Sequence, residues 1–433
     1  MRYFAVNRQG QLCCEGYPLK EIARRVGTPV YVYSHAMLEH HFKMFDEAFA
    51  SVPHIICYSM KANSNGSVIR AFTRLGSGVD IVSGGELARA LAAGASPKKI
   101  VYSGVGKSAP EIEEALRRGI LMFNVESREE LERIDAIARR MRKRAPVAIR
   151  VNPDVDPKTH PYISTGLKRN KFGINIRQAV EDYEWAARRP GLEVIGVDCH
   201  IGSQLTNLSP FIDAAERVRK IVDRLQARGI PIRYVDIGGG VGIRYNDELP
   251  PSPKEYAKVV INAFRGLDIT LVLEPGRALV GNAGALVTEV IYTKQAPMGG
   301  GKGNRWFFVV DAAMNDLARP MMYGSYHAIL PVGKAPAGRV TADVVGPICE
   351  SGDFLAKDRA LPPFKAGDLL AVMSAGAYGF SMSSNYNSRP RSAEVMVSGD
   401  RCEVVRERET VRDIFRRERT ASFLKGSGKR RKA

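Results

Sequence analysis

A lysine at the end of an apolar run is the first residue whose position suggests chemistry. The run HIICYSM, residues 54 to 60, is followed directly by Lys61 in the segment YSMKAN. A lysine at the end of a buried strand either extends its ammonium group to solvent or acts as a nucleophile, because desolvation disfavours the charged form and lowers the pKa. Position alone leaves these two interpretations equally open.

Three later runs end in groups that could hold an anion or an aromatic ring. HIGSQ (200 to 204) contributes His200 and Ser203, DIGGGVG (236 to 242) contributes Gly238, Gly239 and Gly240, and EPGR (274 to 277) contributes Glu274 and Arg277. Each motif alone has an ordinary explanation: a core histidine, a tight turn, a strand-end ion pair. A glycine turn after a strand also lets backbone N–H groups approach a phosphate closely.

Taken together, these groups form a set with a specific use. They are the groups that pyridoxal 5'-phosphate (PLP) requires. A lysine forms the Schiff base, a glycine turn and an arginine bind the phosphate, and a carboxylate pairs with the pyridinium nitrogen. The sequence has no His-x-x-x-His or paired-cysteine spacing and no GxxxxGK[ST] loop. We therefore expect PLP as the cofactor, no metal and no bound nucleotide.

The elements that must position these groups are eight short apolar runs separated by helix-like segments. Such alternation predicts a parallel sheet with crossover helices, and eight units predict a (β/α)8 barrel of the TIM type. Helical periodicity with serine caps and glycine ends supports helices over residues 84–94, 108–119 and 127–144. The barrel would bring the ends of all runs to one mouth; the runs are residues 54–60, 79–83, 99–103, 121–127, 147–152, 194–200, 234–240 and 270–275.

The pattern changes near Gly284, where alternating runs broken by Gly and Pro predict a mainly β domain. We assign residues 27–283 to the PLP-binding barrel and residues 1–26 and 284–420 to the β-sheet domain. Residues 421–433, which end in GSGKRRKA, should form a basic, disordered tail.

Composition restricts the class of protein. The 45% apolar and 25% charged residues are those of a soluble globular protein, and no segment is apolar enough to span a membrane. The six cysteines show no disulfide framework, and no secretory signal precedes the first run, so we expect a cytoplasmic protein with free thiols. The net charge of +18 is spread along the chain and concentrated at its end, which favours a solvated tail over a nucleic-acid-binding arm.

The motifs resemble those of the PLP-dependent decarboxylases with the alanine-racemase fold, and within them the diaminopimelate decarboxylase family. The likeness covers about residues 10 to 410, and the motifs come in the family's order: YSMKAN, DIVSGGE, HIGSQ, GGGVGI, EPGR, DAAMNDLARPMMY, GPICESGD and AGAYGFSMSSNYNSRPR. Ser59 and Val241 stand where the family often has Ala and Leu, and neither departure touches a chemical group.

The resemblance implies a role for each matching residue. Lys61 would hold PLP as an internal aldimine, His200 would stack on the pyridine ring, and Glu274 would pair with its nitrogen, where the related racemase uses an arginine. Cys349 would protonate the carbanion. The cofactor-binding set would also contain Asp80, Ser203, Gly238, Gly239, Gly240, Gly276, Arg277 and Tyr378; the substrate-binding set would be Arg277, Arg319, Tyr323, Glu350 and Tyr378. In this family the CESGD loop reaches the neighbouring subunit's site, which implies a homodimer with shared active sites.

Charge selects the substrate within the family. Ornithine would present a distal ammonium and call for carboxylates, whereas diaminopimelate presents a distal carboxylate that Arg319 can bind while Glu350 meets the amine. We therefore expect a carboxy-lyase that converts meso-2,6-diaminopimelate to L-lysine and CO2, the last step of lysine biosynthesis. One alternative is a decarboxylase for another diamino acid. The other is a non-catalytic PLP carrier, but proteins of that type lack a β domain, so the predicted β domain argues against it.

Overall fold

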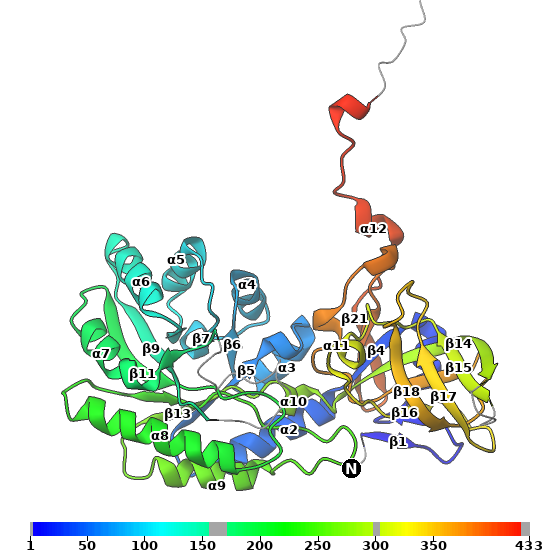
Figure 1. The fold of residues 1–433 in the computed structure, drawn as a ribbon, viewed down its shortest axis with the longest axis horizontal. Helices are drawn as coiled ribbons and strands as arrows, with labels where there is room; N and C mark the ends of the chain where they lie inside the picture. The colour runs from blue at the N-terminus through cyan, green and yellow to red at the C-terminus, as the bar shows by residue number, and fades with distance from the viewer. Residues whose placement is uncertain (1–2, 156–170, 298–303, 426–433) are drawn as a thin grey trace, which may run out of the picture.

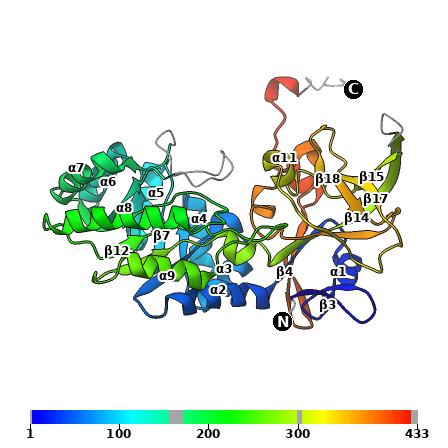
Figure 2. The same ribbon diagram turned by 60° about the horizontal axis from the view of Figure 1, so that its bottom comes forward.

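The structure, a computed structural model, describes residues 3–155, 171–297 and 304–425. Two bodies lie side by side (Figures 1 and 2), a barrel at the left of both views and a β domain at the right. The described part of the chain contains no helix that is both long enough and apolar enough to cross a membrane.

The barrel confirms the predicted fold class. Eight parallel strands pair in chain order and close through pairing of β8 with β9 and of β13 with β5. Each of the eight predicted runs overlaps one of them, and β6, β9 and β11 begin one or two residues before their runs. They are β5 (His54–Ser59), β6 (Gly78–Ile81), β7 (Ile100–Tyr102), β8 (Met122–Val125), β9 (Ala145–Asn152), β11 (Leu192–Asp198), β12 (Tyr234–Asp236) and β13 (Thr270–Leu273), with the short β10 (Ile174–Asn175) added beside β9.

Helices surround the barrel and begin where the sequence supplies caps. Ser108 and Glu111 form a capping box at α5, Ser127 accepts the backbone N–H of Glu130 at α6, and Gly119 adopts a left-handed conformation after α5. The barrel helices are α2 (His35–Phe49), α3 (Gly66–Arg74), α4 (Gly84–Ala92), α5 (Ala109–Arg118), α6 (Arg128–Arg140), α7 (Ile176–Ala187), α8 (Ser209–Gln226), α9 (Pro253–Ala263) and the short α10 (Arg277–Val280).

The second body is a mixed sheet with the order β18-β17-β15-β14-β4-β20-β21, and β16 and β19 join it beside β14. This confirms the mainly β domain expected beyond Gly284. Its strands are β4 (Val30–Ser34), β14 (Gly284–Pro297), β15 (Asn304–Val310), β16 (Ile329–Pro331), β17 (Val340–Val345), β18 (Phe354–Leu361), β19 (Leu369–Val372), β20 (Ala393–Ser398) and β21 (Arg401–Arg406); its helices are α11 (Arg319–Tyr323) and α12 (Val411–Phe415).

Strand pairing changes the N-terminal boundary that the sequence suggested. β4 falls inside the range assigned to the barrel, yet it pairs with β14 and β20 of the mixed sheet. Residues before it form β1 (Phe4–Val6), β2 (Leu12–Cys14), β3 (Tyr17–Pro18) and α1 (Leu19–Val26), a separate three-stranded sheet that shares a buried apolar core with β4 and β20. We therefore propose that the barrel domain runs from His35 to about residue 283 and that all earlier residues belong to the β domain.

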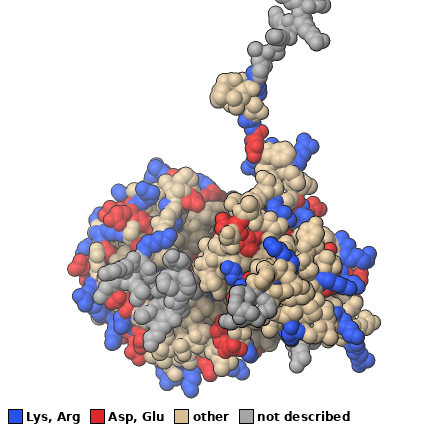
Figure 3. Space-filling view, turned by 45° about the vertical axis from the view of Figure 1, so that its right-hand side comes forward, with Lys and Arg blue, Asp and Glu red and all other residues tan. Residues whose placement is uncertain are grey.

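Charge is distributed over the surface as the sequence suggested. Lysine and arginine side chains are interspersed with acidic ones over the face shown in Figure 3. The chain after β21 leaves the β domain as an arm that carries α12 (Figure 1). Residues 426–433 of the predicted disordered tail lie outside the described residues. Five of the six cysteines are buried, and Cys349 is exposed.

Candidate active site

Lys61 lies directly after β5, at the mouth of the barrel. Its Nζ is 2.5 Å from Oδ2 of Asp80, which is fully buried at the end of β6, and the Ser59 hydroxyl donates to the same oxygen. Burial lowers the pKa of Lys61, but the negative charges of Asp80 and Glu274 outweigh burial and raise it above its ordinary value. Desolvation therefore acts on the pKa in the predicted direction, but the neighbouring acids reverse the net shift.

The glycine turn follows β12 and lies against His200. Gly238 has φ +66° and Gly240 has φ +105°, conformations that favour glycine. A Cβ on Gly239 would lie 2.2 Å from the carbonyl oxygen of Glu274, and one on Gly238 would lie 2.6 Å from Nδ1 of His200. The backbone N–H of Gly239 donates to that nitrogen at 3.1 Å. Burial, with the positive charges of Arg150 and Lys61, lowers the pKa of His200 well below its usual value, so the ring is neutral.

Arg277 connects the turn to the end of β13. Its Nη2 donates to Oγ of Ser203 at 3.1 Å, and its guanidinium carbon lies 4.9 Å from the ring centre of Tyr378. Gly276 packs against β5, since a Cβ there would lie 3.0 Å from Cβ of Ser59. These residues and Lys61 line one cavity.

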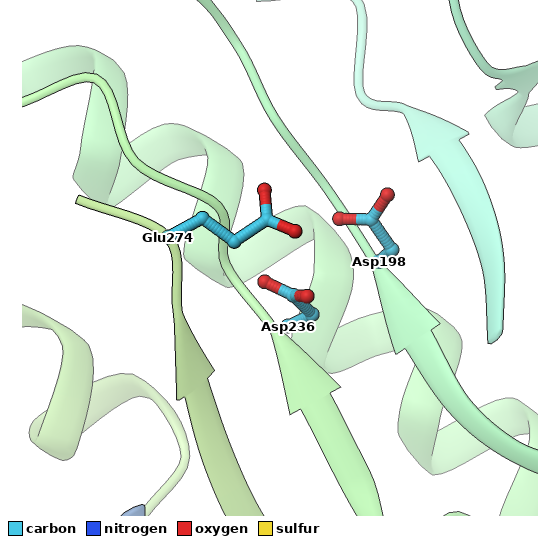
Figure 4. A group of neighbouring side chains, drawn as sticks. All are labelled: Asp198, Asp236 and Glu274. Carbon is cyan, nitrogen blue, oxygen red and sulfur yellow. The ribbon is translucent and has the colours of Figure 1, made fainter. Parts of the chain in front are cut away.

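Three carboxyl groups converge below this cavity. Asp198, Asp236 and Glu274 come from the ends of the adjacent strands β11, β12 and β13, and their side chains point toward one another (Figure 4). The side-chain amide of Asn124 donates to Asp236 at 3.0 Å and to Glu274 at 3.2 Å, and the hydroxyl of Ser103 also donates to Glu274 at 3.2 Å. All five side chains are buried.

Burial and mutual repulsion keep this acid cluster partly protonated. Burial and the charge of Asp198 raise the pKa of Asp236 to about 7. Burial, Asp236 and Asp80 raise the pKa of Glu274 well above its usual range. Arg150, which pairs with Glu126 at 2.8 Å, is the cation nearest to Asp198, at 4.0 Å. The amide of Asn124 joins Asp236 to Glu274 but does not reach Asp198. The expectation of no metal stays a prediction.

A second arginine approaches from the β domain. Arg319 begins α11, is only 5% exposed, and its Nη2 donates to Oγ of Ser325 at 3.0 Å. Its guanidinium carbon lies 4.8 Å from the ring centre of Tyr245, whose hydroxyl accepts a 2.6 Å hydrogen bond from Arg277. Within the described ranges, neither Arg277 nor Arg319 forms a salt bridge with an acid, and the Nε atom of each has no hydrogen-bond partner. Two buried cations therefore have no acidic partner among the described residues.

Comparison with known proteins assigns the family. Residues 35–281 match the model of the pyridoxal-dependent decarboxylase family, pyridoxal binding domain. Diaminopimelate decarboxylase of Vibrio cholerae is 52% identical over 96% of this chain and 98% of its own length, and that of Pseudomonas aeruginosa is 53% identical over 94% and 97%. The chain belongs to the diaminopimelate decarboxylases. The crystal structure of the Helicobacter pylori diaminopimelate decarboxylase complexed with L-lysine superposes with a TM-score of 0.88, at 45% identity over 92% of this chain and 98% of that one.

The cavity of this diaminopimelate decarboxylase fits PLP. Glycines 238 to 240 leave space that any side chain would fill, and Arg277 beside Ser203 offers an unpaired buried cation to a phosphate. A pyridinium nitrogen would add a cation beside Glu274, whose charged form is disfavoured by burial and by the neighbouring Asp236 and Asp80. Lys61 lines the same cavity, so the residues present can hold the group by its aldehyde, its phosphate and its ring nitrogen.

Five residues expected at the site do not line the cavity of this single decarboxylase chain: Asp80, which binds Lys61, and Arg319, Tyr323, Cys349 and Glu350. Cys349 and Glu350 are exposed in the loop between β17 and β18; the N–H of Cys349 donates to Asn387, and Glu350 accepts from Gly352 within its own turn. Tyr323 is half-buried at the end of α11. The Arg277 guanidinium, 4.9 Å from the ring centre of Tyr378, makes a cation–π contact with that ring. No role of these residues is tested by their positions alone.

Sequence reasoning missed three residues of this diaminopimelate decarboxylase site: Asp236, Asn124 and Tyr245. Asp236 lies in the predicted strand YVDIGGG (234–240), and Asn124 lies in LMFNVES (121–127). A polar residue within such an apolar run was the feature that could have marked each of them as a site residue. Tyr245 follows the glycine turn in GIRYNDE, where nothing in the local pattern distinguishes it from an ordinary loop aromatic.

Proposed function

We propose that this protein is a PLP-dependent carboxy-lyase that converts meso-2,6-diaminopimelate to L-lysine and CO2. The observation that supports the substrate is the pair of buried guanidinium groups of Arg277 and Arg319, which have no acid partner in the described residues. Arg277 lines the cavity of Lys61, and Arg319 contacts Tyr245, to which Arg277 is hydrogen-bonded. Buried charges without counter-ions are costly, so their retention supports a ligand that carries carboxylate.

The cofactor would be anchored by Lys61 and held at the ends of four strands. When bound, PLP supplies an electron sink for the electron pair left when CO2 departs. His200 would contact the ring face as a neutral group. Glu274 would carry its negative charge opposite the ring nitrogen, and Asn124 and Ser103 orient its carboxyl group. The cofactor site would be completed by the glycine turn, Ser203 and Arg277. We also assign Asp80, Gly276 and Tyr378 to this site.

The distal end of the substrate decides between members of the family. A substrate such as ornithine ends in an ammonium group and needs acids near the entrance. Arg319 offers the opposite charge, and a planar guanidinium can bind a carboxylate through two parallel hydrogen bonds. We assign Arg319 with Arg277 to the distal carboxylate, Tyr323 and Tyr378 to the same pocket, and Glu350 to the distal amine.

Decarboxylation breaks the bond between Cα and the carboxylate and requires a proton at that carbon. We assign the donor role to Cys349. Since Cys349 and Glu350 are exposed and outside the cavity of their own chain, we propose that they act at the site of a second copy, in a homodimer. The absence of an apolar span from the described helices is compatible with the cytoplasmic location that we propose for this biosynthetic enzyme.

The test is coupled detection of L-lysine from meso-diaminopimelate, with and without added PLP. We expect PLP-dependent formation of L-lysine and CO2, and turnover at least ~10⁴ times slower with ornithine, lysine or carboxynorspermidine at equal concentration. Faster turnover of any of these would replace the proposed substrate. No CO2 from any of them, with PLP bound, would favour a carrier role.

A further inference from the structure

Tyr245 lies between Arg277 and Arg319 and contacts both. It is 8% exposed and follows the glycine turn. Its hydroxyl oxygen accepts a 2.6 Å hydrogen bond from Nη1 of Arg277, and the centre of its ring lies 4.8 Å from the guanidinium carbon of Arg319 and 5.8 Å from that of Arg277. One side chain thus connects an arginine of the barrel to an arginine of the β domain.

A neutral histidine fixes the ring from another direction. His327 is fully buried, packs edge-to-face on Tyr245 with ring centres 5.3 Å apart, and its Nδ1 lies 2.8 Å from the carbonyl oxygen of Met373. Burial and the charge of Arg319 lower the pKa of His327 to about 3, so it adds no positive charge beside the two arginines. Tyr245 is therefore held in one orientation at the point where two like charges approach.

The choice of tyrosine at this position has a chemical reason. An aspartate or glutamate between the two arginines would neutralise them and compete with a carboxylate ligand. An aromatic ring attracts guanidinium groups through its electron-rich face without carrying a charge, and the phenol oxygen accepts a hydrogen bond as well. The two guanidinium groups are thereby kept in place while their charges stay available.

We propose that Tyr245 is a positioning residue that sets the spacing of Arg277 and Arg319 for the distal carboxylate of the substrate. This inference rests on the proposed function, because it takes diaminopimelate as the ligand. That distal carboxylate survives the reaction as the only carboxylate of L-lysine. Binding of the product therefore reports the arrangement of the two arginines separately from the chemical step.

The experiment compares Tyr245→Phe and Tyr245→Leu in the PLP-loaded enzyme. The phenylalanine variant keeps the ring that faces Arg319 and loses the acceptor for Arg277, and the leucine variant loses both. We expect KM for diaminopimelate and Kd for L-lysine, measured by calorimetry, to rise about tenfold in the first variant and about a hundredfold in the second. kcat should stay within about twofold, because ground state and transition state lose the same contact.

Two matched controls separate positioning from general damage. 1,5-Diaminopentane is L-lysine without its carboxylate, so its Kd should not change in either variant. Tyr183→Phe removes an equally buried hydroxyl, which hydrogen-bonds to the backbone of Ile149 and Gly196 in the barrel wall, and it should lower Tm without changing Kd for L-lysine.

The outcomes distinguish the two proposals. Unchanged KM and Kd in both Tyr245 variants would overturn the positioning role, as would an equal loss of affinity for 1,5-diaminopentane. A fall in kcat and Tm with unchanged affinity for L-lysine would also overturn it, since that is the behaviour of a purely structural residue. Failure of the wild-type enzyme to release CO2 from diaminopimelate would instead refute the proposed function.

Discussion

Replacement of Arg319 by methionine should improve stability and impair substrate binding at the same time. Arg319 is 5% exposed, has no acid partner in the described residues, and its Nε has no hydrogen-bond partner. Burial and the charge of Arg277 lower its pKa, which shows that its charge is disfavoured in the ligand-free state. Methionine fills a similar volume without a charge, so the ligand-free protein should be as stable as the wild type or more stable by about 1–3 kcal/mol.

The functional loss is calculated from the interaction that the arginine would make with the distal carboxylate. A hydrogen bond to a charged group contributes about 1.5–3 kcal/mol, which corresponds to a rise in KM of about 10- to 150-fold. We expect about 10² for Arg319→Met with diaminopimelate, and a much smaller change in kcat. Steady-state kinetics of the PLP-loaded enzyme and thermal denaturation of the ligand-free enzyme measure the two quantities.

Arg150 is the matched control, because it is equally buried but has acid partners. It pairs with Glu126 at 2.8 Å and lies 4.0 Å from Asp198, so Arg150→Met leaves these acids without a cation and should cost about 3–5 kcal/mol of stability. Opposite stability changes in the two variants are the expected result. A marked loss of stability in Arg319→Met with an unchanged KM would refute the reasoning, since Arg319 would then be structural.

Three further predictions concern the cofactor end of the site. Lys61→Ala should abolish the absorption of lysine-bound PLP, and a surviving band would identify another lysine as the anchor. Cys349→Ala should retain PLP and slow turnover, whereas unaltered kinetics would exclude the donor role. Burial raises the pKa of Asp236 to about 7 in the folded protein. Between about pH 4 and pH 7 the folded protein therefore keeps a proton that the unfolded chain releases. The free energy of unfolding should fall as the pH rises through this range. Asp236→Asn should remove that contribution, raising Tm of the ligand-free enzyme at pH 7 but not at pH 4; an equal change at both values would contradict it.

The barrel could be predicted because its signal is local and repeated. Each of the eight strands is a short apolar run, and caps such as Ser108 and Ser127 mark where the helices begin. The error at β4 has a physical reason. VYVYS, residues 30 to 34, is apolar on both faces, as a central strand of either sheet would be, and only its pairing with β14 and β20 decides the sheet to which it belongs.

The candidate site could be predicted as far as it follows strand ends. Lys61 and Glu274 come directly after apolar runs, so the barrel geometry alone brings them to one mouth. The contact of Arg319 with Tyr245 joins the two domains across 74 positions of sequence, and no local pattern encodes it. The net direction of the pKa shift of Lys61 could not be predicted from burial alone, because it depends on Asp80, whose oxygen lies 2.5 Å from the amine.

The charges of the site are segregated rather than paired. Asp198, Asp236 and Glu274 gather below the cavity, and Arg277 and Arg319 gather on the side of the β domain, so neither set neutralises the other. Like charges within each set repel one another, which disfavours their charged forms, and Arg150, 4.0 Å from Asp198, compensates only part of this repulsion. A ligand pair with a cationic ring nitrogen at one end and a carboxylate at the other would supply both counter-charges. Binding should therefore stabilise this fold by more than its contacts alone.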